Sequence, residues 1–320
     1  MKSKNRIVLG VDTSCYTTSI AAVSLDKEIL VSQKIQLKVQ QGNKGLRQSD
    51  AVYQHVNNLG EIFSILRAYR EEYEIKAICV STKPRPLESS YMPVFNAGYK
   101  FAKAISDIMD IPLYESTHQE GHIEAGYIDT NMNENKFICV HISGGTTEIL
   151  LAKRENAKYN LEIIGESKDI SAGQLIDRVG VKLGYPFPAG KYIDENAINF
   201  KENINDIKIS SSEGYINFSG VETKIYDIIK EYPKEYICKL TLECINKSLL
   251  KSLIYLCNKH YVNKVLFVGG VSSSRYISSV LKDSLNKHNI SSYWTRPEYA
   301  TDNAVGVALI GAQSILCGVE

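Results

Sequence analysis

Two histidines four residues apart are the sharpest chemical signal in this 320-residue chain. They bound the segment His118-Gln119-Glu120-Gly121-His122, and on a helix this spacing places both imidazoles on one face. Two imidazoles on one face can bind the same divalent metal ion. The spacing alone still favours the plainer alternative, in which two surface or core histidines share a helix face without any metal.

The same segment speaks against a zinc peptidase. In the peptidase motif the glutamate directly follows the first histidine, whereas Glu120 stands two positions after His118. At about 100° per residue, Glu120 lies about 200° around the helix from His118. Peptidase activity is therefore the weakest of the hypotheses considered for this chain.

Carboxylates elsewhere in the chain could complete a metal or ribose site. Asp302 lies in Thr301-Asp302-Asn303, just before a predicted final helix, and on local grounds a cap of that helix by Thr301 or Asp302 is the better interpretation. Asp169 and Asp177 could contact a ribose or a metal-bound water. Their plainer roles are a helix cap for Asp169 and a solvated helix face for Asp177.

Three predicted strands end in polar or glycine-rich turns, near Asp12, Ser143 and Gly269. Backbone N–H groups exposed by glycine can cradle phosphate, and a following helix N-terminus adds a favourable dipole. One such turn could merely reverse the chain, but three at strand ends favour a nucleotide or phosphate site. His141, in the strand before Ser143, could contact a ligand through its backbone.

The elements that must position these residues follow a pattern that occurs twice. The first half has predicted strands at 7–12, 18–23, 28–35 and 75–80, and helices at 49–69 and 94–109. The second half has predicted strands at 137–142, 148–152, 161–164, 265–268 and 291–294, and helices at 172–183, 221–229, 235–260, 272–286 and 303–316. Ser49 and Asp50 are candidate caps of the first helix.

Each half opens with a strand hairpin whose link is polar, such as 13–17, and then adds helices and a further strand. This predicts a duplicated α/β fold with lobes at 1–115 and 116–320 and a ligand cleft between them. The C-terminal helix is expected to pack back on the first lobe.

Composition fits a globular protein and carries no global signal for nucleic acid. The chain has 37 basic and 36 acidic residues, so tRNA binding would need a local basic face or a partner subunit. No apolar stretch is long enough for a signal-peptide core or a membrane helix. The seven cysteines are scattered, as is typical of a reducing compartment. We therefore expect a cytoplasmic protein without membrane contact.

Taken in order, several motifs resemble those of the tRNA threonylcarbamoyl transferases, once described as glycoprotease-type peptidases. They cover nearly the whole chain, which makes the joint pattern more specific than any single motif. They are Gly10-Val11-Asp12-Thr13-Ser14-Cys15, His118 with Gly121 and His122, Ser143-Gly144-Gly145, Gly165-Glu166-Ser167 with Asp169, Ala172-Gly173, Asp177-Arg178, Phe218-Ser219-Gly220-Val221-Glu222-Thr223, Gly269-Gly270-Val271-Ser272 and Thr301-Asp302-Asn303.

The resemblance implies the actin/sugar-kinase/heat-shock ATPase fold. It also implies transfer of a threonylcarbamoyl group from threonylcarbamoyl-adenylate to N6 of the adenosine beside the anticodon of tRNA. One divalent ion, iron or zinc, would be held by His118, His122 and Asp302 and act as Lewis acid and template. A homo- or heterodimer through the first lobe, with partner subunits assisting tRNA binding, is also suggested.

The resemblance further assigns residues to the substrate. Asp12 and Ser14 are the candidate catalytic residues. The adenine nucleotide (threonylcarbamoyl-AMP, AMP or ATP) would be bound by His141, Ile142, Ser143, Gly144, Gly145, Asp177, Gly190, Gly269, Gly270 and Ser274.

Losses from the family pattern concentrate around the first-lobe side of the predicted cleft, while the metal positions are kept. Tyr16 and Thr17 stand where the family usually has an Asp-Glu pair, and a carboxylate can orient or deprotonate an attacking amine where these side chains cannot at neutral pH. We therefore expect a diverged paralogue that keeps the metal and the nucleotide. The other departures are Lys83-Pro84-Arg85-Pro86 for a Gly-Pro-Gly loop, Thr146 for His, Gln174 for Glu and Ser274 for Asn.

Two alternatives stay open beside this transferase hypothesis. One is a non-catalytic paralogue that serves as a scaffold in a tRNA-modification complex. The other is a kinase-like phosphotransferase of the same fold, in which Asp12 would be the catalytic carboxylate.

Overall fold

The computed structural model describes residues 4–14, 16–39, 46–69, 71–156, 158–205 and 208–318. The chain separates into two compact units. The first comprises Met1–Ile128, Arg154–Tyr159 and Thr301–Glu320, and the second comprises Asp129–Lys153 and Asn160–Ala300. Cys15 of the first motif lies outside the described residues.

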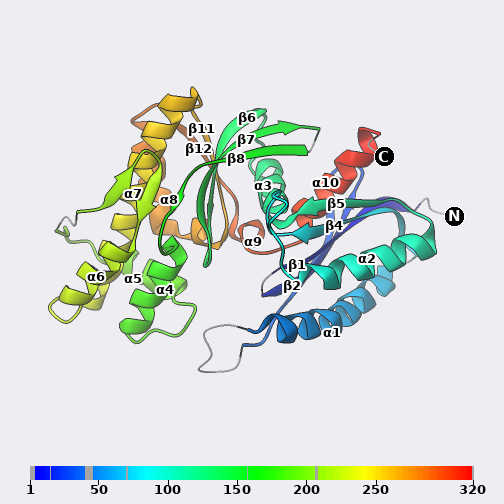
Figure 1. Cartoon of the computed structure of the whole chain (residues 1–320), viewed down its shortest axis with the longest axis horizontal. Coiled ribbons are helices and arrows are strands. Elements are labelled where there is room, and N and C mark those ends of the chain that lie inside the picture. Colours follow the sequence, from blue (N-terminus) through cyan, green and yellow to red (C-terminus); the bar gives the residue numbers. More distant parts are fainter. Residues whose placement is uncertain are drawn as a thin grey trace. The chain divides into compact units, whose positions relative to one another are not determined.

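The first unit is built on a five-stranded sheet with helices on both faces (Figure 1). Its strands, in the order β3-β2-β1-β4-β5, are β1 (Asn5–Ser14), β2 (Thr17–Ser24), β3 (Ile29–Gln36), β4 (Tyr73–Lys83) and β5 (Leu113–Thr117). Its helices are α1 (Gln48–Leu66), η1 (Arg67–Tyr69), α2 (Phe95–Met109), α3 (His118–Asp129) and α10 (Val305–Leu316).

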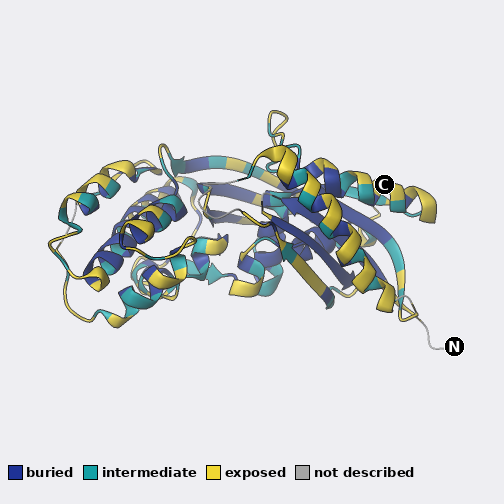
Figure 2. Cartoon of the chain, turned by 90° about the horizontal axis from the view of Figure 1, so that it is seen from below, coloured by how far each residue is buried: buried dark blue, intermediate teal, exposed yellow. Residues whose placement is uncertain are grey.

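Strand β1 is apolar from Ile7 to Val11 because both of its faces are covered there. Leu9 and Val11 lie in one buried cluster with Leu59 of α1, whereas Val8 packs with Val307 of α10. Successive side chains of a strand point to opposite faces, so a strand buried on both sides cannot alternate with polar residues. Figure 2 shows the inner strands of this sheet mostly in dark blue and much of α1 in yellow.

Glycines let α10 lie close to its neighbours. A Cβ on Gly10 would come within 2.5 Å of the carbonyl oxygen of Ala304, and a Cβ on Gly306 would overlap the carbonyl oxygen of Gly121. Helix α3 therefore crosses α10 at backbone distance. This contact is why α3 belongs to the first unit, whereas the sequence-based division at 115/116 assigned it to the second half.

The second unit is built on a seven-stranded sheet. Its strands, in the order β12-β11-β6-β7-β8-β10-β9, are β6 (Lys136–Ile142), β7 (Thr147–Glu155), β8 (Lys158–Ser167), β9 (Ser210–Ser212), β10 (Tyr215–Asn217), β11 (Lys264–Val268) and β12 (Ser291–Trp294). Its helices are α4 (Ala172–Lys182), α5 (Gly190–Asn199), α6 (Ser219–Ile228), α7 (Lys234–His260), η2 (Gly270–Ser273), α8 (Arg275–Asn286) and α9 (Pro297–Ala300).

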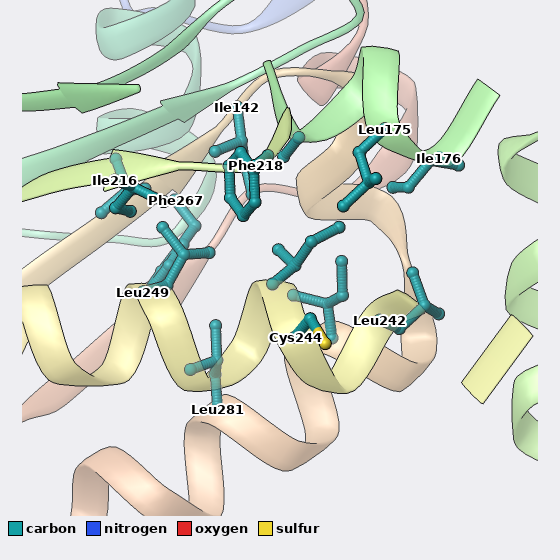
Figure 3. Packing of buried hydrophobic residues seen from close by; sticks show 14 of the residues in the cluster. Ile142, Leu175, Ile176, Ile216, Phe218, Leu242, Cys244, Leu249, Phe267 and Leu281 are labelled. Atoms are coloured by element: carbon teal, nitrogen blue, oxygen red, sulfur yellow. The ribbon is translucent and has the colours of Figure 1, made fainter. Parts of the chain in front are cut away.

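Helix α7 runs through the core of the second unit. Leu249 of α7 packs among Ile142 of β6, Phe267 of β11 and Leu281 of α8 (Figure 3). The length of α7 and its mostly buried surface follow from this central place. Within the described ranges, no helix combines the length and apolar character needed to cross a membrane.

The two sheets share one topology. In each, an antiparallel hairpin starts the sheet, β1 with β2 and β6 with β7, and a later strand pairs in parallel with the first one, β4 with β1 and β11 with β6. The orders β3-β2-β1-β4-β5 and β8-β7-β6-β11-β12 correspond strand by strand. The prediction of a duplicated α/β fold is confirmed.

Some local predictions were wrong. The first hairpin has no five-residue polar link, because Ser14 pairs with Thr17 and both side chains are buried in the strands. Neither Ser49 nor Asp50 caps α1, which begins at Gln48 after Arg47 without a side-chain cap. The missed elements β5, α5, β9 and β10 are mostly short, and short segments carry little periodic signal.

We predict that Gly306→Ala lowers the free energy of unfolding by about 3 kcal/mol, because the new methyl group must push α3 and α10 apart. Gly60→Ala is the control: Gly60 lies on α1 and its added Cβ would meet no described atom within 4 Å. That change should stabilise the protein by about 0.5–1 kcal/mol through helix propensity. Chemical denaturation measures both, and equal effects would contradict the close helix contact.

A second prediction concerns His55, which is fully buried on α1 with its Nδ1 2.8 Å from Thr18 Oγ1. Burial lowers the pKa of His55 to about 4, below the value of about 6.5 in an unfolded chain. The unfolded chain therefore binds the proton more readily, and stability falls as pH drops from about 6.5 towards about 4.

The variant His55→Gln keeps a side chain that can bond to Thr18 but cannot titrate. It should lose less stability than the parent over this pH window. Denaturation curves at several pH values give the comparison, and parallel losses in the two proteins would show that His55 does not contribute.

Candidate functional site

The three predicted metal ligands come together in the first unit. His118 opens α3 directly after β5 and His122 follows one turn later. Their Nε2 atoms are 3.1 Å apart, and Oδ1 of Asp302 lies 3.4 Å from Nε2 of His118 and 3.3 Å from Nε2 of His122. Among the described residues this is the one group of three His, Cys, Asp or Glu side chains placed to share an ion.

Asp302 faces the imidazoles, and Asn303 rather than Asp302 bonds to the start of the last helix. Oδ1 of Asn303 accepts a hydrogen bond from the backbone N–H of Val305 at 2.9 Å, where α10 begins. Lys34 donates to the hydroxyl oxygen of Thr301 at 2.8 Å. The interpretation of Thr301 or Asp302 as the cap of the last helix is therefore wrong.

Asp12 lies fully buried near the end of β1 and contacts His118 from the other side of the ring. Nδ1 of His118 donates to Oδ1 of Asp12 at 3.3 Å. The hydroxyl of Ser14 donates to Oδ2 at 2.5 Å, and the hydroxyl of Ser81 donates to Oδ1. A carboxylate on Nδ1–H orients the ring, so that Nε2 faces Asp302 and His122.

The carboxylates of the cluster stabilise positive charge on the imidazoles between them. Burial would raise the pKa of Asp302, but hydrogen bonds from the two imidazoles outweigh it and hold that pKa well below its usual value. Burial would likewise raise the pKa of Asp12, yet the charge of His118 lowers it. Two ionised carboxylates thus flank the pair of imidazoles.

The side chain of Glu120 forms its hydrogen bonds at the start of its own helix. Its Oε2 accepts hydrogen bonds from the backbone N–H and the hydroxyl of Thr117, at 2.8 and 2.7 Å. The carboxylate therefore closes the first turn of α3, and the zinc-peptidase geometry is not formed by this segment.

In the second unit, the Ser143-Gly144-Gly145 turn lies against the start of α4. The hydroxyl of Ser171 donates to the carbonyl oxygen of Gly144 at 2.9 Å, and a Cβ on Gly173 would overlap the carbonyl oxygen of Ser143. Gly144 and Gly145 are exposed. An exposed glycine turn beside a helix N-terminus is a suitable anion site.

The second glycine turn lies beside the first. Val268 at the end of β11 pairs with His141 of β6, and Gly269 follows with a φ of +92°. A Cβ at Gly269 would overlap the carbonyl oxygen of Ile142, so only glycine fits this approach. The predicted residues 141–145 and 269–270 therefore lie at the same end of two adjacent parallel strands.

The predicted polar residues of the second unit hold helix starts. Asp177 is half-buried, and its Oδ1 accepts from the backbone N–H of Ala189 at 2.7 Å, just before Gly190 opens α5. Burial raises the pKa of Asp177, so a freely solvated helix face is the wrong description. Ser274 accepts from the backbone N–H of Ile277 at 3.1 Å and caps α8.

Asp169 is a helix cap, but of a helix distant in sequence. It accepts from the backbone N–H groups of Phe218 and Ser219 at 2.8 and 3.0 Å, at the start of α6. Helix α4 is instead capped by Ser171 and Gln174, and this Ser-x-x-Gln spacing is a signal the sequence does carry. Asp194, which accepts from Ser274, has no such local signal.

Solved structures share this fold. HypF from T. kodakarensis is 12% identical with a TM-score of 0.67, and the match covers 98% of this chain and 48% of HypF, about half its length. A ROK family glucokinase from Streptomyces griseus, solved with glucose and AMPPNP, is 11% identical with a TM-score of 0.52 over 95% of this chain and 98% of its own. The chain therefore has the actin/sugar-kinase/heat-shock ATPase fold that was predicted.

The sequence comparisons go further than the fold. The family described as TsaD, tRNA N6-adenosine threonylcarbamoyltransferase, matches residues 29–309. A curated relative of that name from Thermosipho africanus is 30% identical, over 98% of this chain and 96% of its own length. The chain belongs to this family of transferases, and the predicted membership is confirmed.

Proposed function

We propose that this protein is a metal- and adenine-nucleotide-dependent transferase that moves a threonylcarbamoyl group to N6 of an adenosine in tRNA. The amine nitrogen would bond to the carbamoyl carbon and lose a proton, while the bond from that carbon to the phosphate oxygen breaks and AMP leaves. The convergence of His118, His122 and Asp302 in a chain of this family carries the proposal.

The spacing of the three ligand atoms fits a metal ion. Bonds of about 2.0–2.1 Å in a tetrahedral arrangement put ligand atoms about 3.3 Å apart, and the separations here are 3.1, 3.3 and 3.4 Å. Three protein ligands leave room for a substrate oxygen. Bound iron or zinc would supply Lewis acidity towards a carbonyl or phosphate oxygen.

Asp12 and Ser14 are proposed to act through His118. Asp12 is fully buried and bonded to His118, Ser14 and Ser81, so its carboxylate orients the imidazole. A kinase-like phosphotransferase would need this carboxylate at the acceptor hydroxyl, and its existing partners argue against that alternative. A pure scaffold would have no physical need for such a network around three ligands.

The adenine nucleotide is proposed to bind the second unit. Gly144 and Gly145 expose backbone beside α4, and Gly269 and Gly270 lie at the end of the neighbouring strand. Helix starts held by Asp177 and Ser274 add N-terminal dipoles to the same unit. The chain carries nearly equal numbers of basic and acidic residues, so we propose that partner subunits supply part of the basic surface that binds tRNA. A tRNA substrate fits a cytoplasmic location.

For the metal site, we predict that the double variant His118→Ala/His122→Ala loses stoichiometric metal. Asp12→Asn should keep the site but weaken zinc affinity by about 10- to 100-fold, because an orienting carboxylate is lost. Asp107→Asn, which alters an exposed i, i+4 ion pair with Lys103 on α2, is the control. Elemental analysis and chelator competition give the readouts, and full metal in the double variant would refute the site.

A further prediction concerns the rate of threonylcarbamoyl transfer. Tyr16 is 45% exposed, whereas Thr17 is buried in β2, so only Tyr16 can present a side chain where the family's acidic pair stands. Without a positioned base, we expect turnover to be about 100- to 10,000-fold below that of the Thermosipho africanus relative. Tyr16→Asp should raise it, and Tyr16→Asn should not.

The assay supplies threonylcarbamoyl-adenylate, tRNA and zinc or iron, and follows the modified nucleoside. Turnover by the unmodified chain equal to that of the relative would contradict divergence at this position. Inactivity of every variant, with metal and AMP binding intact, would point to another acceptor or to a scaffold.

A further inference from the structure

A buried ionic cluster surrounds Glu124 on α3, away from the predicted ligands. Nε and one terminal nitrogen of Arg154 donate to the two oxygens of Glu124 at 2.9 and 2.7 Å. The hydroxyl of Tyr159 donates to Oε2 of Glu124 at 2.5 Å, and the guanidinium lies over the ring of Tyr127, 4.5 Å from its centre. Glu124 is fully buried, so this carboxylate has exchanged water for fixed partners.

Stability alone does not explain such a cluster. A buried ion pair loses most of its Coulomb energy to desolvation, and apolar residues of similar size often stabilise a fold equally well. What the cluster provides is direction, because a bidentate guanidinium fixes a carboxylate in both distance and angle. Arg154 lies near the end of β7 and Tyr159 near the start of β8, within the segment Arg154–Tyr159 that belongs to the first unit. The adjoining ends of two strands thus fix one point on α3.

The fixed point lies on a different side of α3 from the imidazoles. Glu124 stands two residues after His122, about 200° around the helix. Gly121 contacts α10 on another side of the helix. The glycine contact sets how close α3 comes to α10, but a glycine has no side chain that resists rotation of the helix about its own axis.

Small rotations of α3 would matter for a metal. Side chains reach about 5–6 Å from a helix axis, so a turn of about 10° moves an imidazole nitrogen by about 1 Å. Metal–ligand distances tolerate only about 0.2 Å. A second anchor on another side of α3 would limit such rotation and keep His118 and His122 aligned with Asp302.

We propose that Glu124, Arg154 and Tyr159 form a clamp that sets the rotation of α3 and thereby positions His118 and His122. The inference rests on the proposed metal site and adds three positioning residues to it. It gives the ends of β7 and β8 a role in the metal site.

The test separates position from stability. The double variant Glu124→Leu/Arg154→Met replaces the ion pair by apolar side chains of similar size, and Tyr159→Phe removes one hydroxyl. Tyr276→Phe is the matched control, because the hydroxyl of Tyr276 also donates to a glutamate, Glu243, at 2.6 Å, in the second unit. Each full-length protein is titrated with Co²⁺, followed by its visible absorption, and its zinc affinity and melting temperature are measured.

We expect the double variant to melt within a few degrees of the parent while its zinc affinity falls about 10- to 100-fold and its Co²⁺ spectrum changes. Tyr159→Phe should show a smaller shift of the same kind, and Tyr276→Phe none.

Unchanged metal affinity and spectrum in Tyr159→Phe and in a folded double variant would overturn the clamp while leaving the metal site in place. Should the double variant fail to fold, Tyr159→Phe alone decides. A parent protein that binds neither ion would overturn the metal site itself and the clamp with it.

Discussion

The backbone contact between Gly121 and Gly306 is the constraint on which the first unit depends. Two of the predicted ligands are on α3, and the third precedes α10, so the distance between these helices decides whether the three side chains can meet. Any side chain at Gly306 would hold the helices apart. Gly10 extends the same close packing to β1, the strand that ends beside His118 with Asp12.

One row of paired residues across the sheet of the first unit is polar. Asp12 pairs with Ser19 and Ser19 with Lys34, while on the other side Ser81 bonds to Asp12. Residues 8–11 of β1, which precede this row, are apolar and packed between helices. Asp12 and Ser19 can be buried there because Ser81 and His118 bond to the Asp12 carboxylate and the hydroxyl of Ser19 donates to the Asp12 carbonyl oxygen. Lys34, at the edge of the row, is exposed. The sheet thus holds the carboxylate of Asp12 beside His118 at the start of α3.

The second unit repeats the topology but uses its strand ends differently. Its glycine turns after β6 and β11 leave backbone exposed, and three of its helices are capped by Ser171, Ala189 with Asp177, and Ser274. Fixed caps orient helix N-termini at little entropic cost on ligand binding. The duplication therefore produced one unit whose side chains converge and one whose backbone and helix ends are exposed.

The sequence by itself determined the order of the main strands and helices, the duplicated plan and the pairing of His118 with His122, because alternation and i, i+4 spacing are local properties. It did not determine which carboxylates join them: the local evidence made Asp302 a helix cap, and only the family resemblance made it a ligand. Only tertiary structure brings these carboxylates to the two imidazoles, since Asp302 lies 180 positions from His122, and Asp12 lies 106 positions from His118. Glu124 and Arg154 gave no sequence signal at all, because a buried ion pair is created by packing between segments whose own patterns do not require it.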